Sequence, residues 1–178
     1  IWRKYLDFAS IADVQSLKRQ IHAVKGHGTI AVRGHNLKLG RGGIREIEFF
    51  VQTQQLIAGG RNPKLRGRRT CEMLDALAEA KWIAPETAAD LKASYRFLRL
   101  IEHRIQMQSD AQSHTLPADD AAFMVFARFA GYGDADALSN KLRRTFELVQ
   151  QHYARLFEDA GELGTSEGSL VFTGGEDD

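Results

Sequence analysis

One glycine-rich stretch, residues 36–50 (NLKLGRGGIREIEFF), carries the residue types best suited to bind an anion. Its glycines allow a tight turn just before a predicted helix, where free N–H groups and the positive end of the helix dipole attract negative charge. Three cations add charge of the same sign. The candidate set for phosphate or nucleotide binding, or for lining a cleft, is Lys38, Gly40, Arg41, Gly42, Gly43, Arg45 and Glu48.

The known phosphate-binding motifs do not describe this stretch. No Lys-Ser or Lys-Thr pair follows its last glycine, as a P-loop requires, and Arg45 stands where the dinucleotide-binding fingerprint needs its third glycine. A tight turn with no ligand therefore remains open as the alternative. On the predicted helix, Glu48 shares a polar face with Arg45, Gln52 and Gln55, and this face points into a cleft or into water.

Glu46 and Glu48 are the only close carboxylates in the stretch, and a helix would separate them. Residues two apart point in nearly opposite directions on a helix, so these glutamates are not expected to hold one metal ion together. The six histidines show no metal-binding spacing, and the lone Cys71 lies in a leucine-containing helical pattern. We therefore predict no catalytic residue and no metal ligand within the chain.

A second polar cluster lies on a long predicted helix, at residues Arg99, Glu102 and Gln106. Their spacing of three and four residues allows a local ion pair and a hydrogen bond on one helix face. They are candidates for supporting the glycine-rich stretch.

Apolar periodicity predicts the elements that must position these residues. The pattern indicates helices over residues 1–22, 43–58, 70–82, 85–109, 118–130 and 134–159. A short extended segment is expected near residues 29–39, where glycines break the helical pattern. The prediction is a mainly all-α fold, a bundle of five or six helices. Because the first helical pattern starts at Ile1 without an N-cap, we expect further chain upstream.

Composition favours a globular cytoplasmic protein. Hydrophobic residues make up 43% and charged residues 26%, and no apolar run reaches the roughly 20 residues of a membrane helix. Residues 1–70 hold 14 Lys and Arg against 4 Asp and Glu, which would attract phosphates or an acidic protein surface. Nucleic acid is the least favoured partner, since few aromatic residues lie among these charges.

A more specific indication comes from residues 38–49 (KLGRGGIREIEF), which closely resemble a signature of the glutamine synthetase adenylyltransferases. They are more loosely similar to the uridylyltransferases that modify the PII signal protein. The resemblance covers roughly residues 1–160. The forms IWR and GIREIEF resemble the first of the two homologous halves of that enzyme, which removes adenylyl groups. Other parts of the family pattern occur before and after this stretch, in the same order as in the family, at residues 1–8, 59–63, 97–106 and 115–117.

The resemblance implies a bifunctional enzyme that adenylylates a tyrosine of glutamine synthetase with ATP and removes the AMP by phosphorolysis, giving ADP. It implies Mg²⁺ and ATP or ADP as cofactors of the full-length enzyme, and an aspartate pair that follows a Gly-Ser turn. Asp119-Asp120 lacks the one-residue gap, and Asp134-Ala-Asp136 fits the N-cap of a helix. We therefore expect the catalytic aspartates upstream of Ile1, and a fragment that is inactive and holds no cofactor alone.

The implied organisation has three parts. Residues 1–39 join an absent upstream nucleotidyltransferase domain, residues 40–160 form the helical bundle, and residues 161–178 are an acidic, glycine-rich linker. In the first hypothesis, residues 38–48 close one wall of the neighbouring nucleotide cleft, with Glu48 orienting Arg45 or a metal-bound water. The alternative is a non-catalytic scaffold or docking module that binds glutamine synthetase or the PII signal protein, aided by the basic loop at residues 61–69.

Overall fold

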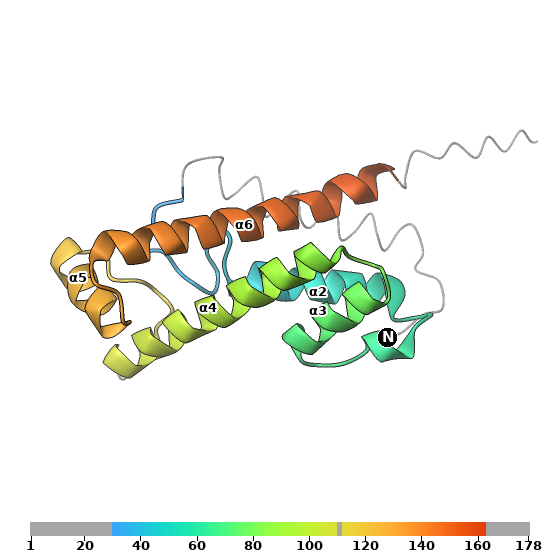
Figure 1. Ribbon diagram of the computed structural model, residues 1–178, viewed down its shortest axis with the longest axis horizontal. Helices are drawn as coiled ribbons and strands as arrows, with labels where there is room; N and C mark the ends of the chain where they lie inside the picture. Colours follow the sequence, from blue (N-terminus) through green and yellow to red (C-terminus); the bar gives the residue numbers. More distant parts are fainter. Residues whose placement is uncertain (1–29, 110–111, 163–178) are drawn as a thin grey trace, which may run out of the picture.

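The computed structural model describes residues 30–109 and 112–162, and these residues form a mainly helical bundle (Figure 1). The described part contains no β-sheet, only one isolated antiparallel bridge between Asn36 and Thr115. The prediction of an all-α bundle is therefore confirmed. The elements are α2 (Ile44–Ala58), the 3₁₀ helix η1 (Pro63–Leu65), α3 (Thr70–Glu79), α4 (Pro85–Ser109), α5 (Asp120–Phe129) and α6 (Ala135–Glu162).

The two longest helices, α4 and α6, lie antiparallel beside each other along the length of the bundle (Figure 1). Helix α2 contacts both of them, α3 packs on α4, and α5 covers one end of α6. Each helix buries one apolar stripe, because residues three and four apart share a face. The largest fully buried side chains are Phe123, Phe126, Phe146, Leu37, Ile44, Ile47, Leu65, Leu74, Leu77, Leu91, Leu98 and Ile101.

Aspartate side chains mark the starts of the last two helices. Asp119 Oδ1 accepts a hydrogen bond from the Ala122 N–H at 2.9 Å, and Asp134 Oδ1 accepts one from the Ala137 N–H at 2.6 Å. A side-chain oxygen in this place satisfies an N–H that the helix leaves without a partner. The interpretation of Asp134 as an N-cap is confirmed.

Helix α3 ends three residues earlier than predicted, at Glu79 rather than Trp82. Lys81 adopts a positive φ of 58°, the Trp82 N–H donates to the Leu77 carbonyl at 2.9 Å, and the Lys81 N–H donates to the Ala78 carbonyl at 2.9 Å. This pair of bonds is a Schellman motif, which glycine usually closes. A lysine in the glycine position hid the helix end from sequence reasoning.

Residues 30–40 have no helix, as expected, but the extended backbone predicted there is interrupted by turns. Turns occupy residues 33–34 and 37–39, and Asn36 forms the bridge to Thr115. The helix predicted over residues 1–22 lies outside the described residues, as do residues 163–178 of the expected linker. Among the residues that the structure describes, no helix is both long enough and apolar enough to cross a membrane.

Candidate functional site

The glycine-rich turn, residues 38–45, is tied to the connection between α4 and α5. The Leu37 N–H donates to the His114 carbonyl at 2.8 Å, and the Leu116 N–H donates to the His35 carbonyl at 2.9 Å. Asn36 then starts the turn, because its side-chain oxygen accepts hydrogen bonds from the N–H groups of Lys38 (3.0 Å) and Leu39 (2.8 Å). Asparagine favours such a turn since its amide mimics a backbone carbonyl.

Glycine at position 42 lets the turn press against α6. Gly42 has a φ of +68°, and a Cβ atom placed on it would lie 2.2 Å from the carbonyl oxygen of Phe146. Gly40 and Gly43 are also crowded, since a Cβ would meet Asn36 O at 2.4 Å and Leu37 O at 2.6 Å respectively. The three glycines therefore permit close backbone packing as well as the turn itself.

The N–H groups at the start of α2 already have protein partners. The N–H groups of Ile44, Arg45 and Glu46 donate to the carbonyls of Leu37 (2.9 Å), Lys38 (3.1 Å) and Gly43 (3.1 Å), respectively. These N–H groups are therefore used in hydrogen bonds within the turn and its helix. A ligand anion at this place would meet side chains rather than a cradle of free N–H groups.

Glu46 fills the position that an anion was expected to take. Its Oε2 atom accepts a hydrogen bond from the Gly42 N–H at 2.8 Å, and its side chain is buried. A glutamate at the third position of a helix can reach back to an N–H before the helix, as in a capping box. Sequence reasoning missed this role, although Glu46 stands three residues after the N-cap Gly43.

The three cations of the turn differ in their surroundings. Arg41 Nη2 donates to Gln150 Oε1 on α6 at 2.7 Å, which helps to fix the turn on that helix. Lys38 is half-buried and Arg45 is exposed, and neither side chain has a hydrogen bond or ion pair within residues 30–109 and 112–162. These two cations remain available to a partner or ligand.

Glu48 lies on the opposite side of α2 from Glu46, as the helix spacing predicted. Its Oε1 atom accepts a hydrogen bond from the Tyr95 hydroxyl on α4 at 3.2 Å. Burial raises the pKa of Tyr95, and the nearby Glu48 carboxylate raises it further, so the tyrosine stays protonated and able to donate. Glu48 is thus held by α4 rather than by Arg45.

Gln55 corrects the predicted polar face of α2. It is buried, and its amide nitrogen donates to the carbonyls of Leu65 (2.8 Å) and Gly67 (2.9 Å). The loop after α2 folds back over this side chain, which helical periodicity could not reveal. Gln52 and Arg45 are exposed as expected.

The supporting cluster on α4 forms around the buried carboxylate of Glu102. Arg99 Nη1 donates to Glu102 Oε2 at 2.8 Å, which confirms the local ion pair. The predicted hydrogen bond to Gln106 does not form within the described residues, and His114 approaches instead, with Nδ1 2.7 Å from Glu102 Oε1. That contact departs from hydrogen-bond geometry, and neither buried atom has another partner there.

This cluster lies one residue from the bridge that starts the glycine-rich turn. The side chain of His114 contacts the carboxylate of Glu102, and its backbone carbonyl accepts a hydrogen bond from the Leu37 N–H. One residue therefore joins α4 to the glycine-rich turn. The described residues contain no group of three or more His, Cys, Asp or Glu side chains that could hold a metal ion.

Comparison with known proteins gives a consistent result. Residues 14–157 match the family model described as GlnD PII-uridylyltransferase. The chain is 60% identical over 178 residues to a protein of Mesorhizobium japonicum and to one of Brucella melitensis, and 55% identical to one of Xanthobacter autotrophicus. Each is named bifunctional glutamine synthetase adenylyltransferase/adenylyl-removing enzyme. All of this chain is covered in these alignments, but it spans only 18% of the length of each relative.

Proposed function

The chain belongs to the GlnD PII-uridylyltransferase family, and on that premise we propose that it is a helical domain of a bifunctional glutamine synthetase adenylyltransferase/adenylyl-removing enzyme. Identity of 60% over the whole chain supports this proposal. Glutamine synthetase is then the protein substrate, and the cytoplasm is the compartment. The chain spans 18% of the length of such relatives, and we propose that the reaction centres lie in the parts of the enzyme that it does not span.

Within that enzyme, we propose that the glycine-rich turn forms one wall of the nucleotide cleft of the deadenylylating half. The observation that carries this proposal is a hydrogen-bonded turn with two cations, Lys38 and Arg45, whose side chains have no partner among the residues that the structure describes. Fixed cations stabilise the charge that develops on a transferring phosphoryl group, and they act best when the fold holds them in place beforehand. Arg41 serves the same turn by holding it to Gln150.

The described residues do not fit a metal ion, because they lack a cluster of three suitable ligands. Mg²⁺ and the nucleotide are therefore assigned to the neighbouring nucleotidyltransferase domains, and no step here runs through them. Glu102 is proposed to support the turn through His114, whose carbonyl receives the Leu37 N–H. The fragment alone is expected to be inactive.

The basic loop favours a second function, docking of an acidic protein surface. Lys64 and Arg68 are exposed and their side chains have no partner within the described residues, whereas Arg69 forms an ion pair with Glu72. Glutamine synthetase and the PII signal protein are the candidate partners. Such a basic patch would change the rate of association with a partner and the choice of partner more than the rate of the catalysed reaction.

Alanine variants of the full-length enzyme separate the two functions. Lys38→Ala and Arg45→Ala should each lower deadenylylation, measured as ADP release from adenylylated glutamine synthetase and phosphate, by about 100-fold. Lys64→Ala and Arg68→Ala are matched controls that remove an exposed cation elsewhere. They should leave the turnover number unchanged.

The opposite pattern would support docking. If Lys64→Ala and Arg68→Ala weaken binding to glutamine synthetase while the turn variants keep full turnover, the cleft-wall proposal is wrong. Helical content, measured by circular dichroism, must match the unmodified enzyme in all four variants. Lys38 and Arg45 make no ion pair with another residue in the ranges 30–109 and 112–162, so their removal should not unfold the domain.

A further inference from the structure

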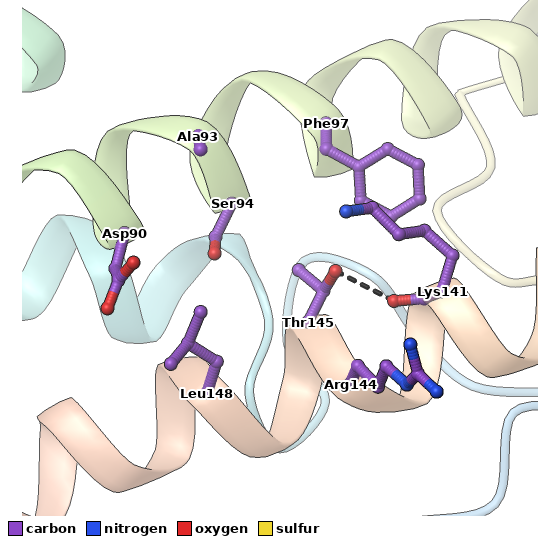
Figure 2. Close-up of a pocket in the computed structure, with 8 residues that line it drawn as sticks. All are labelled: Asp90, Ala93, Ser94, Phe97, Lys141, Arg144, Thr145 and Leu148. Carbon is purple, nitrogen blue, oxygen red and sulfur yellow. Dashed lines mark hydrogen bonds between the residues drawn. The ribbon is translucent and has the colours of Figure 1, made fainter.

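A groove lies between α4 and α6, on a different face of α6 from the glycine-rich turn. Figure 2 shows its lining, which combines side chains from both helices. Its volume is about 240 Å³. Sites for drug-sized ligands usually measure roughly 300–1,000 Å³, so this groove suits a smaller molecule.

The wall of the groove also contains a serine hydroxyl, that of Ser94. Ser94 is only 5% exposed, and its side chain makes no hydrogen bond within residues 30–109 and 112–162. Figure 2 shows the hydroxyl directed toward the facing helix, where Thr145 lies. Thr145 is different, since its hydroxyl donates to the Lys141 carbonyl at 2.8 Å. The Ser94 hydroxyl can therefore donate a hydrogen bond to a ligand atom in the groove or accept one from it.

One end of the groove is positively charged. Arg144 is exposed and forms no ion pair or hydrogen bond within the described residues. Lys141 lies beside it, with its Nζ atom 5.6 Å from the centre of the Phe97 ring. The cation–π contact places the ammonium at the groove without neutralising it.

The acid at the other end of the groove does not cancel this charge. Asp90 Oδ2 lies 2.9 Å from His152 Nε2, and this pair links α4 to α6. Asp90 and Phe97 are seven residues apart on one helix, which corresponds to about 10 Å along its axis. The uncompensated charge of the groove is therefore that of Lys141 and Arg144.

We propose that this groove binds a small organic anion, a carboxylate or a phosphate monoester with a short carbon skeleton. Arg144 and Lys141 hold the anionic group, and Ser94 hydrogen-bonds a polar atom of the ligand. Apolar atoms of Phe97 and Leu148 contact its carbon skeleton. The proposal does not depend on the enzymatic function proposed above, because it concerns binding alone.

Isothermal titration calorimetry of the 178-residue chain at about 150 mM salt tests the proposal, since this ionic strength screens weak surface attraction. The three probes are inorganic phosphate, glycerol 3-phosphate and lactate, which distinguish a phosphate from a carboxylate ligand. We expect saturable binding of one equivalent of glycerol 3-phosphate or lactate. Inorganic phosphate should bind more weakly because it has no carbon skeleton.

Matched variants identify the site. Arg144→Gln should weaken binding at least about tenfold, because it removes a charge-assisted hydrogen bond. Ser94→Ala should weaken it about threefold to tenfold. Arg143→Gln removes the adjacent arginine, which contacts Asn140 outside the groove, and should change the dissociation constant by less than about twofold.

Two results would overturn the proposal. The first is the absence of saturable binding by all three probes up to about 10 mM, a concentration that corresponds to very weak affinity. The second is an equal loss of binding in Arg143→Gln and Arg144→Gln, which would indicate diffuse attraction to a basic helix face. Thermal unfolding of each variant checks that the groove is still formed.

Discussion

Replacing Gly42 by alanine tests whether the glycine-rich turn is seated on α6 as closely as the structure shows. Two separate costs are expected. Alanine at a φ of +68° is strained, and its Cβ would lie 2.2 Å from the Phe146 carbonyl oxygen and 2.5 Å from the Phe146 Cα. Both opposing atoms belong to a helix backbone, so neither can rotate away.

The left-handed conformation costs an L-residue roughly 1–2 kcal/mol. Forcing an extra methyl group into a packed contact costs roughly 1–3 kcal/mol more. The free energy of unfolding should therefore fall by about 2–5 kcal/mol in Gly42→Ala. For a chain of this size that is a loss of roughly 6–15 °C in Tm.

Three other glycines provide controls for the two costs. Gly131 has a φ of +90° with nothing within 4 Å of a Cβ, so Gly131→Ala carries only the conformational cost. Gly43 has a φ of −83° and a Cβ position 2.6 Å from Leu37 O, so Gly43→Ala carries only the steric cost. Gly133 has neither feature, and Gly133→Ala should change stability by less than about 0.5 kcal/mol.

Urea unfolding followed by circular dichroism gives the four free energies in one series. Gly42→Ala should lose more stability than any of the other three variants. If Gly42→Ala and Gly131→Ala lose the same amount, the close approach to Phe146 is absent and the reasoning is refuted. If Gly43→Ala is as stable as Gly133→Ala, the crowding at the start of α2 is likewise refuted.

Two further changes probe the buried polar groups. Glu102→Ala should lower the free energy of unfolding by about 1–3 kcal/mol, because both the ion pair with Arg99 and the contact with His114 Nδ1 are lost. A loss no larger than that of Arg99→Ala in urea unfolding would contradict this. Burial and the negative charge of the Glu46 carboxylate together raise the pKa of Tyr153 to about 12, so the folded state favours the protonated hydroxyl. Stability should be intact below pH about 10 and fall by up to about 3 kcal/mol as pH rises toward 12, and Tyr153→Phe should show a smaller fall over that range in the same assay.

The helices could be predicted from the sequence because their signals are local. Pro85 opens α4 at the predicted residue, and the predicted bounds of α2 and α6 agree with the observed ones to within three residues. Lys81 shows the limit, since a Schellman motif closed by lysine has no glycine to mark it. The end of α3 was therefore misplaced.

The site could be predicted less completely, because its decisive contacts join residues far apart in the chain. The glycines and cations of the turn were found, but the roles of Phe146 and Gln150 depend on how α6 packs. The burial of Gln55 was missed for the same reason, since its partners Leu65 and Gly67 lie at the end of η1 and in the loop after it. The involvement of Lys38, Arg45 and the other candidate residues in a nucleotide cleft stays a prediction.

Helix α6 serves two neighbours at once, and this restricts which changes of length the chain can tolerate. Phe146 and Gln150 hold the glycine-rich turn, while Thr145 and Leu148 line the groove against α4. One residue inserted between Lys141 and Tyr153 would turn everything beyond it by about 100°. The side chains beyond the insertion would then no longer face the glycine-rich turn or α4. An insertion in the Gly131–Gly133 connection would not rotate the residues of α6 relative to one another.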